Sequence, residues 1–477
     1  MESLVQAIFE NGMHRPDKIA LIVEDTQLTY GELTHKIAVF ANSLKVKKIK
    51  RGSRVVIETH DLASFYCAFL GCHLAGCIAV PVERDISIYK LHELLKAVKP
   101  VLIFIKNQGE KYEDFFEGSV PKKIAFPKEE QEATVVSTTG TTGNPALVVH
   151  TNKSMLAETQ NLCTGTNITQ DTVLFTNILG HMAAGYRRVF AALYAGATAV
   201  ITDQSVSLHM LGKYAEKYKI DHLSLISTDV RLLAEEASLD KTEKLDSVKY
   251  VESATSTLYY DTILKFHAMF PHVVLFNVYG TTESGCLLIN NTLDNFTDGC
   301  IGRPACNAQV SVVDENGERI ETPGKYGYVS VKGSMNMKGY YKKKALTDKV
   351  LQQDTIVLND IVYFDEAGDF YFVSRVGDVI NVKGQKIIPA EIERQAMQFG
   401  GIRDCACVAK DDEQQGQVPV LYIVCEDEQA FDFNRFRNYL HENLEAYRVP
   451  RDIIPIEKMP CTPTGKIMRK HLALMIK

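Results

Sequence analysis

The sequence has no hydrophobic run long enough to cross a membrane. Its longest nearly uncharged stretch covers residues 189–202, whereas a transmembrane helix needs roughly 20 consecutive apolar residues. The first residues also lack the basic flank and the apolar core of a secretory signal. We therefore expect a cytoplasmic protein without a membrane span.

The sequence also lacks an excess of positive charge and a regular spacing of cysteines. The formal net charge is −6, so the composition gives no electrostatic reason to expect nucleic-acid binding. The 11 cysteines are irregularly spaced and odd in number, which argues against a disulfide framework and favours a reducing compartment. Cys405 and Cys407 form the closest pair, but no second pair lies nearby, so we expect no metal site there.

The length and the hydrophobic pattern predict a layered protein with more than one domain. A chain of 477 residues is too long for one ordinary core. Short apolar runs alternate with helix-like stretches, which favours parallel sheets covered by helices on both faces. These runs lie at residues 20–23, 55–57, 101–105, 198–202, 223–226 and 273–276.

The pattern changes from about residue 305 onward. Residues 310–313 and 328–332 are typical of strands, and an Asn-Gly pair within residues 314–317 predicts a tight hairpin turn between them. The sequence therefore predicts an α/β fold. Its large N-terminal domain, residues 1–374, would consist of layered α/β sheets plus a β-ribbon or barrel-like subdomain.

Residues 375–477 are long enough to form a small, separate and mobile α+β domain. Pro389, followed by two glutamates, predicts the start of a helix. Residues 418–425 are typical of a strand despite an internal proline. The spacing of Phe436, Leu440 and Leu444 predicts an amphipathic helix.

A loop rich in hydroxyl groups and glycine occupies residues 137–145, which read Ser-Thr-Thr-Gly-Thr-Thr-Gly-Asn-Pro. Its glycines allow the backbone to turn N–H groups inward, and its hydroxyls add rotatable donors, so the loop suits polyphosphate oxygens. It is not the loop of P-loop NTPases, because no Lys-Ser/Thr pair follows the second glycine. A plain Ser/Thr turn is the alternative.

A second motif, Asn-Val-Tyr-Gly-Thr-Thr-Glu, occupies residues 277–283 directly after an apolar strand. Ligands usually bind at the carboxyl ends of parallel strands. Tyr279 can stack on a base, and Thr281 and Thr282 can donate to phosphate. Glu283 can hold a hard cation such as Mg²⁺. The alternative is an αβ loop in which Thr and Glu cap a helix.

Two further elements carry charged groups. Asp360 is followed along the chain by Ser374 and Arg375, and Lys466 ends a Pro-Thr-Gly-Lys segment. Such a lysine is usually only a solvated charge. It becomes relevant to catalysis if the small domain brings it over a phosphate site.

In this order, the motifs resemble those of the adenylate-forming superfamily, which contains acyl-CoA and aryl-CoA synthetases, the adenylation domains of peptide synthetases and luciferases. The resemblance covers nearly the full length. Further segments similar to family elements lie at residues 28–33 (LTYGEL), 70–81, 327–333, 338–340 and 375–393.

The resemblance implies an ATP-dependent acid–thiol ligase. Such an enzyme activates a carboxylic acid as an acyl-AMP with release of pyrophosphate and then transfers the acyl group to the thiol of coenzyme A. The implied cofactors are ATP, Mg²⁺ and coenzyme A or another phosphopantetheine thiol. One alternative is a stand-alone enzyme that loads an acyl carrier protein. Another is a noncatalytic relative that binds nucleotide or acyl adenylate.

The family's roles carry over to residues of this chain. Asp360 is implied to accept the ribose hydroxyls, Lys466 to bridge the substrate carboxylate and the α-phosphate, and Gly377 to lie at the hinge. The implied catalytic residues are Lys466, Thr282, Glu283 and His181, and Glu283 is also the implied metal ligand. The implied cofactor-binding residues are Thr138, Thr139, Gly140, Thr141, Thr142, Gly143, Asn277, Tyr279, Gly280, Thr281, Asp360, Arg375, Lys383 and Gly384.

The substrate acid is constrained by His181, which lies where CoA ligases often carry a histidine or an aromatic residue. Amino-acid-activating domains place an aspartate there, because a desolvated ammonium group needs a compensating carboxylate. We therefore expect no amino acid. Room for an aryl or medium-chain acyl acid is indicated by small residues near the presumed pocket, namely Ala183, Ala184, Gly185, Ala254 and Gly285. A packed core histidine is the alternative for His181, and His150 is also expected to be structural.

The chain departs from the family pattern at several positions. Residues 143–146 lack both usual lysines of the phosphate loop, residues 253–256 lack the usual glycines, and Gly377 replaces the usual Asp or Lys of the hinge. The threonine and glycine that usually precede the ribose-binding acid are also replaced. Because the other implied site residues are present, we expect an active enzyme with a modified nucleotide site.

Overall fold

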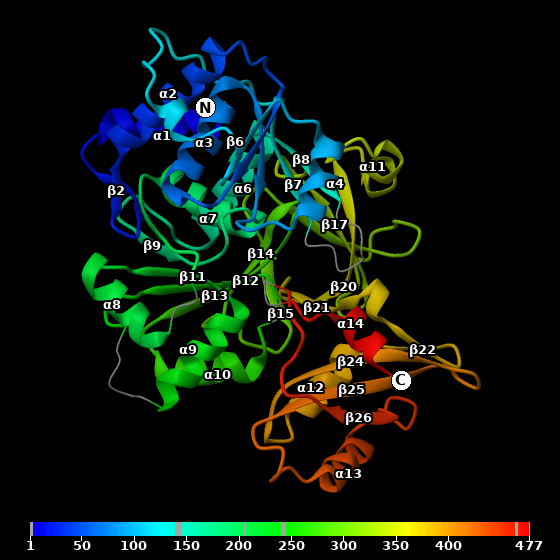
Figure 1. Cartoon of the computed structure of the whole chain (residues 1–477). Coiled ribbons are helices and arrows are strands. Elements are labelled where there is room, and N and C mark those ends of the chain that lie inside the picture. The colour runs from blue at the N-terminus through cyan, green and yellow to red at the C-terminus, as the bar shows by residue number, and fades with distance from the viewer. Residues whose placement is uncertain are drawn as a thin grey trace. The chain divides into compact units, whose positions relative to one another are not determined.

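The computed structural model describes residues 3–138, 146–204, 207–239, 245–256, 258–462 and 466–476. These residues form two compact units. The first contains the described residues of 1–138, 144–310 and 331–356, and the second contains those of 311–330 and 357–477. Figure 1 labels the helices and strands of both units.

The first unit combines helices with two sheets. Its helices are α1 Leu4–His14, α2 Tyr30–Val46, α3 Leu62–Ala75, α4 Ile88–Val98, α5 Glu113–Phe116, α6 Asn152–Gly165, α7 Ala183–Ala195, α8 Leu208–Tyr218, α9 Ser227–Leu239, α10 Tyr260–Met269 and α11 Lys344–Val350. Its strands are β1 Ile19–Val23, β2 Thr26–Thr29, β3 Arg54–Glu58, β4 Ile78–Val82, β5 Leu102–Ile105, β6 Gln108–Gly109, β7 Glu132–Ser137, β8 Leu147–Thr151, β9 Val173–Thr176, β10 Thr198–Ile201, β11 His222–Ile226, β12 Tyr250–Ala254, β13 Val274–Thr281, β14 Gly285–Asn291, β15 Cys300–Pro304, β18 Gly339–Tyr340 and β19 Leu351–Gln352.

One sheet of this unit has the strand order β15-β14-β13-β12-β11-β9-β10-β1-β2. Strands β1 and β9 to β13 run parallel, whereas β13, β14 and β15 pair antiparallel. Helices α8, α9 and α10 cover one face through a cluster that includes Leu211, Leu233 and Phe266. Helices α6 and α7 lie on the other face (Figure 1). Cover on both faces explains the continuous apolar runs of the parallel strands.

The other sheet of this unit has the order β18-β8-β7-β4-β3-β5-β6. In its central strands, every second side chain points to the same face of the sheet. Val56 and Val80 pack with Leu91 and Val98 of α4 in one buried cluster. Strands β7 and β8 form an antiparallel hairpin, and β18 pairs with β8 on its other edge.

The second unit contains most of strands β16 Gln309–Val313, β17 Gly327–Lys332 and β20 Thr355–Phe364. Its other elements are β21 Phe370–Arg375, the 3₁₀ turn η1 Val376–Asp378, β22 Ile380–Val382, β23 Gln385–Ile387, α12 Pro389–Met397, β24 Ile402–Asp412, β25 Gly416–Cys425, α13 Phe433–Asn443, β26 Asp452–Pro455 and α14 Arg469–Met475. Strands β16-β17-β20-β21 are neighbours in this order, and a separate sheet has the order β23-β22-β25-β24, with β26 paired to β25.

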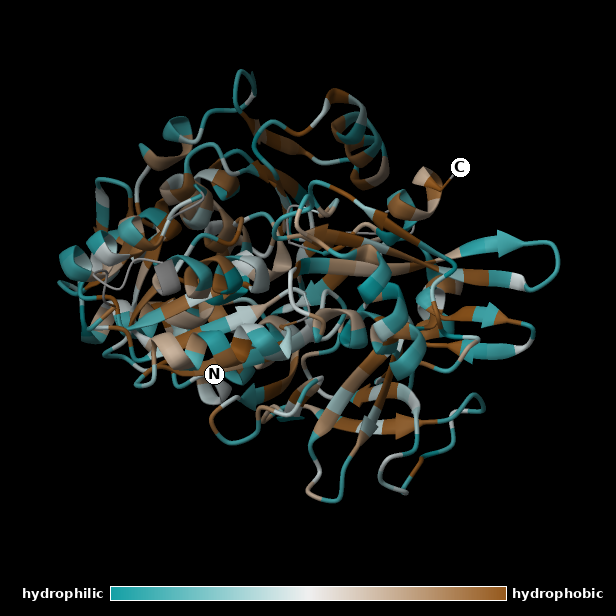
Figure 2. Cartoon of the chain, turned by 90° about the horizontal axis from the view of Figure 1, so that it is seen from below, coloured by the Kyte–Doolittle hydropathy of each residue, from teal (hydrophilic) through white to brown (hydrophobic). Residues whose placement is uncertain are grey.

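The long hairpin of β24 and β25 divides the core of the second unit into two layers. Cys405 and Cys407 face the cluster that contains residues of α12 and α13. Ala406 and Tyr422 face the opposite cluster with Leu472 of α14. The alternation follows from the two-residue period of a strand. Figure 2 shows hydrophilic residues in the turns of several strand pairs and hydrophobic residues mainly within the strands.

The expected α/β architecture, with a large N-terminal part and a small C-terminal α+β part, is confirmed. The apolar runs that we expected to form strands do so, and α12 begins at Pro389 as expected. The domain boundary at residues 374 and 375 stays a prediction. Within the described residues, no helix is both long and apolar enough to cross a bilayer.

One local expectation is wrong, and a second, the amphipathic helix with Phe436, Leu440 and Leu444, is confirmed except at its last residue. Strand β13 does not stop near Phe276 but continues to Thr281, because β14 returns beside it and supplies an antiparallel partner. The motif at residues 277–283 therefore belongs to a β-hairpin and not to an αβ loop. Helix α13 ends at Asn443, and Leu444 packs against the same core from an extended backbone conformation.

Candidate active site

The hairpin of β13 and β14 presents the second sequence motif at its turn. Thr281 pairs with Gly285 across the hairpin, so residues 282–284 form the connection. The backbone N–H of Ser284 donates to Thr281 Oγ1 at 3.1 Å, which closes the turn from within. The side chains of residues 281–283 are partly exposed, whereas Ser284 is buried. The turn thus offers two threonines and a carboxylate to ligands.

Two glycines allow this hairpin to close. A Cβ atom at Gly280 would lie 2.3 Å from the carbonyl oxygen of Gly285, and one at Gly285 would lie 2.4 Å from Cγ of Glu158. Gly285 also has φ +68°, which L side chains rarely adopt. The glycines of this segment therefore have a structural reason that is independent of any ligand.

The carbonyl groups of residues 281–283 are bound from the protein interior. Arg187 Nη1 donates to the carbonyl oxygen of Thr281 at 3.0 Å and Nη2 donates to that of Thr282 at 2.9 Å. The N–H of Met337 donates to the carbonyl oxygen of Glu283 at 2.7 Å. In a trans peptide the C=O and the following N–H point in opposite directions. The amide N–H groups of Thr282 and Glu283 are therefore directed away from Arg187.

A buried ionic group stands behind the turn. Arg187 contacts both carboxylate oxygens of Glu158, at 2.6 Å from Nε and 3.0 Å from Nη2. Arg187 is 5% exposed and Glu158 is fully buried. Burial raises the pKa of Glu158 to about 7, although the charge of Arg187 opposes the shift. The pair is thus held in a strongly desolvated position.

His150 adds a further contact to the same turn. Its Nε2 atom lies 2.8 Å from the carbonyl oxygen of Thr282. Burial lowers the pKa of His150 to about 3, so the ring is neutral at neutral pH. Its Nδ1 atom lies 3.2 Å from Oε1 of Glu158, so the ring touches an acceptor on each side, and the contact with Thr282 is a hydrogen bond when the ring proton is on Nε2. The expected structural role of His150 thus includes the support of a candidate ligand-binding turn.

The carboxylate of Glu283 is held by a tyrosine. Tyr340 Oη donates to Glu283 Oε1 at 2.9 Å. Burial and the neighbouring Glu283 raise the pKa of Tyr340, so the hydroxyl remains a donor. Among the described residues no three His, Cys, Asp or Glu side chains cluster as a metal site. A single oriented carboxylate still fits Mg²⁺, because this ion often takes its other ligands from phosphates and water.

The hydroxyl-rich loop begins and ends at the hairpin of β7 and β8. The N–H of Thr138 donates to the carbonyl oxygen of Ala146 at 2.8 Å, and the N–H of Ala146 donates to Thr138 Oγ1 at 3.0 Å. Strand β8 then carries His150 to the 281–283 turn. Thr139, Gly140, Thr141, Thr142 and Gly143, which were expected to bind phosphate, lie outside the described residues.

Other expected site residues of the first unit have different environments. Asn277 is buried, and its Nδ2 atom donates to the carbonyl oxygen of Cys300 at 3.0 Å. Tyr279 is partly exposed and pairs with Leu288 across the hairpin. His181 lies just before α7, and burial lowers its pKa to about 4, so it is neutral at neutral pH. Its Nδ1 atom is buried and makes no hydrogen bond to a described residue.

In the second unit, the structure brings Asp360 and Arg375 together. They are opposite each other on β20 and β21, and Arg375 Nε donates to Asp360 Oδ1 at 2.9 Å. Asp360 is 4% exposed, whereas the Arg375 side chain is partly exposed. A carboxylate held in this way has acceptor capacity that suits a pair of ribose hydroxyls.

Lys383 and Gly384 form the tight turn between β22 and β23. Both have positive φ, 48° and 85°, as a two-residue hairpin turn requires. The N–H of Gly384 donates to Asn381 Oδ1 at 2.9 Å, and the side chain of Lys383 is exposed. The N–H of Lys383 also donates to the carbonyl oxygen of Gln415 at 2.8 Å, so the turn presents the side-chain cation of Lys383 at the surface of the second unit, with its two amide groups bound within the unit.

Lys466 lies shortly before α14. The N–H of Thr462 donates to the carbonyl oxygen of Lys466 at 2.8 Å, and the N–H of Lys466 donates to Thr462 Oγ1 at 3.2 Å. Three residues later, Arg469 binds the buried carboxylate of Glu393 and the carbonyl oxygen of Cys407. The backbone around Lys466 is thus fixed to the second unit on both sides.

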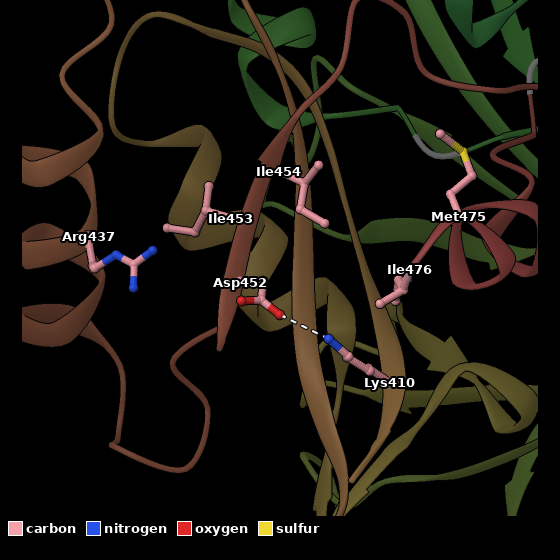
Figure 3. A pocket seen from close by; sticks show the side chains of 7 residues that line it. All are labelled: Lys410, Arg437, Asp452, Ile453, Ile454, Met475 and Ile476. Atoms are coloured by element: carbon pink, nitrogen blue, oxygen red, sulfur yellow. Dashed lines mark hydrogen bonds and ion pairs between the residues drawn. The ribbon is translucent and has the colours of Figure 1, made fainter.

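A cavity of about 440 Å³ lies elsewhere in the second unit (Figure 3). Lys410 and Asp452 form an ion pair at 3.4 Å on its wall, and Ile453 and Ile454 add apolar surface. None of the site residues expected from the sequence lines it. We therefore do not assign the substrate to this cavity.

Sequence reasoning missed Arg187 and Glu158, and it gave Tyr340, which belongs to the family-like segment 338–340, no role in the site. The signal available for the arginine was its place within an otherwise largely apolar helix, α7. A charged residue there is almost never buried without a partner. The partners could not be read from local pattern, because Arg187 and the carbonyl of Thr281 are 94 positions apart in the sequence.

Comparisons with known proteins agree with these observations. The family model described as AMP-binding enzyme matches residues 8–341, and that of the AMP-binding enzyme C-terminal domain matches residues 391–466. The chain is 28% identical to 4-coumarate–CoA ligase-like 6 of Arabidopsis thaliana over 74% of this chain and 64% of that protein. It is 25% identical to 2-succinylbenzoate–CoA ligase of Oceanobacillus iheyensis over 96% of both chains.

The fold also matches solved structures. The crystal structure of ATP-bound MatB from Rhodopseudomonas palustris superposes with a TM-score of 0.92 and 18% identity, and the match covers 100% of both chains. This likeness shows a common fold over the whole length.

Proposed function

Because the chain belongs to the family of AMP-binding enzymes, we propose that it activates a carboxylic acid with ATP, releasing pyrophosphate and forming an acyl adenylate. The 281–283 turn supports this proposal more than any other observation. Its carbonyls are bound from the interior by Arg187 and Met337, its side chains are partly exposed, and Tyr340 holds the carboxylate of Glu283.

The adenylation reaction requires hydrogen-bond donors that are oriented toward the phosphates. A substrate carboxylate that attacks the α-phosphate brings negative charges together, so donors must be oriented in advance toward the phosphate oxygens. In the proposal, Thr282 and the outward amides of the turn bind these oxygens, and Lys466 bridges the carboxylate and the α-phosphate. Glu283 would hold Mg²⁺, which neutralises phosphate charge when it is bound.

The nucleoside part of ATP is assigned to the remaining motif residues. Asp360 would accept hydrogen bonds from the ribose hydroxyls, with Arg375 holding its carboxylate in place. Tyr279 would lie beside the adenine, and the loop at residues 138–143 would contact the β- and γ-phosphates. The side-chain amide of Asn277 contacts Cys300, so we assign it to the support of the hairpin.

The second half of the proposed reaction is transfer to the thiol of coenzyme A. The names of the relatives, two CoA ligases, support this acceptor. The thiol sulfur attacks the carbonyl carbon of the acyl adenylate, and AMP leaves as the thioester forms. The turn of Lys383 and Gly384 would face the thiol after the domain of residues 375–477 moves about Gly377.

The proposed acid is an aryl or medium-chain acyl acid. A neutral His181 provides no negative charge to compensate an ammonium group. An amino acid would therefore lose the hydration of its ammonium group without a partner at this position. The names of the two relatives also refer to aryl acids.

The test is pyrophosphate release by the purified protein with ATP, Mg²⁺ and a panel of aryl and medium-chain acids, first without and then with coenzyme A. We expect pyrophosphate and AMP with at least one acid and a CoA thioester in the mass spectrum. ATP binding without pyrophosphate release for any acid would favour a noncatalytic binding protein. A thioester formed only with an acyl carrier protein would favour the carrier-loading enzyme.

A further inference from the structure

We propose that Arg187, seated on Glu158, is the positioning residue that sets the 281–283 turn for nucleotide binding. The inference rests on the proposed function, because it concerns the same turn. Arg187 itself is buried behind the turn, so it acts on a ligand through the backbone of residues 281 and 282 and not by direct contact.

The geometry depends on the forked shape of the guanidinium group. Its two terminal nitrogens reach the carbonyl oxygens of consecutive residues, Thr281 and Thr282, at 3.0 and 2.9 Å. Its other edge makes a bidentate contact with Glu158. A lysine carries a single nitrogen on a flexible stem and cannot reproduce this set of contacts. The arginine therefore fixes two successive peptide planes at once.

Glu158 supports the opposite strand of the hairpin as well. Gly285 packs so closely against it that a Cβ atom there would lie 2.4 Å from its Cγ atom. His150 Nε2 contacts the carbonyl oxygen of Thr282 from the same side. The turn is thus held at residues 281, 282 and 285 from the side of Arg187 and Glu158. Its amide N–H groups and side chains are left to bind a ligand on the opposite side.

Stability alone does not explain this ion pair. Burying both charges costs solvation energy, and apolar residues of similar volume often replace a buried pair with equal or higher stability. What apolar residues cannot replace is the pair of directed donors to the turn. We therefore infer that the pair serves the conformation of the turn.

Helix α7 contains a matched control in the next residue. Arg188 is 4% exposed and pairs with Glu252, which is fully buried. Its other hydrogen bonds among the described residues go to Ser224 Oγ at 3.2 Å and the carbonyl oxygen of Ala184 at 2.9 Å. It is the same kind of pair on the same helix, but it does not contact the turn.

The experiment compares two double variants. One combines Arg187→Met and Glu158→Met, and the other combines Arg188→Met and Glu252→Met. Calorimetry with ATP and Mg²⁺ measures affinity, and urea unfolding measures stability. We expect the Arg187 double variant to bind ATP about 10- to 100-fold more weakly, which is the loss typical of residues that orient the protein ligands of a metal ion. We expect the Arg188 double variant to bind ATP as the wild type does. We expect the two double variants to have similar stability.

A single variant, Arg187→Lys, keeps the inference testable if the double variant does not fold. We expect it to retain the charge and the fold but to bind ATP at least about tenfold more weakly. Unchanged ATP affinity in a folded Arg187 variant, or an equal loss in both double variants, would overturn the inference. If the wild type itself does not bind ATP, the proposed function fails instead.

Discussion

Replacing Tyr340 with phenylalanine removes one hydroxyl group and with it the hydrogen bond of 2.9 Å to Glu283 Oε1. A hydrogen bond to a charged group contributes about 1.5–3 kcal/mol. Because Tyr340 is only half-buried, we take the lower part of that range, about 1.5–2 kcal/mol. With about 1.4 kcal/mol per tenfold change, the apparent Mg²⁺ affinity should fall by roughly 10- to 30-fold.

The assay is pyrophosphate release at saturating ATP over a range of Mg²⁺ concentrations. The backbone contact of Tyr340 N with Thr347 Oγ1 at 2.9 Å remains in the variant, so we expect little change in fold. Tyr341→Phe is the matched control, because its hydroxyl lies 3.5 Å from the carbonyl oxygen of Val98 and not at Glu283. An unchanged Mg²⁺ midpoint for Tyr340→Phe, or an equal shift for Tyr341→Phe, would refute the reasoning.

Three further predictions concern other parts of the chain. Lys466→Ala should reduce pyrophosphate release by orders of magnitude and leave ATP binding intact, because it removes the cation that is proposed to bridge carboxylate and α-phosphate; normal release in this variant would show that the assignment is wrong. Gly377→Ala should leave the unfolding temperature unchanged or slightly higher, since no described atom lies within 4 Å of a Cβ built there and the replacement restricts the unfolded chain. It should slow thioester formation relative to pyrophosphate release. A ratio of these two rates equal to that of the wild type would contradict the hinge assignment. The wild type should lose free energy of unfolding relative to His73→Asn as the pH falls below about 6.5, by up to about 1.4 kcal/mol per pH unit. The cause is that burial lowers the pKa of His73 to about 3, so only the unfolded chain takes up the proton. Urea unfolding measures both free energies of unfolding, and a difference between wild type and variant that does not change with pH would contradict this prediction.

The fold was largely predictable because its layers are encoded locally. The parallel strands of the first unit are short apolar runs, since helices cover both faces of the sheet. Pro389 marked the start of α12. The end of β13 was not predictable in the same way, because residues 277–281 are polar or small and owe their extended conformation to pairing with β14.

The candidate site was predictable only in part, for a related reason. Short motifs identified residues that we propose to bind the ligand, such as Thr282 and Glu283. The residues that hold them come from distant parts of the chain, 57 positions away for Tyr340 and 95 for the contact of Arg187 with Thr282. No local period connects such partners, so only the folded structure shows that Arg187 and Tyr340 support the same turn.

The most direct test of the central claim is a crystal structure of this protein determined with ATP and Mg²⁺. We predict that the phosphates lie within hydrogen-bonding distance of the 281–283 turn and that Mg²⁺ lies on the carboxylate of Glu283. A nucleotide bound elsewhere, with the turn making no contact with it, would contradict the account.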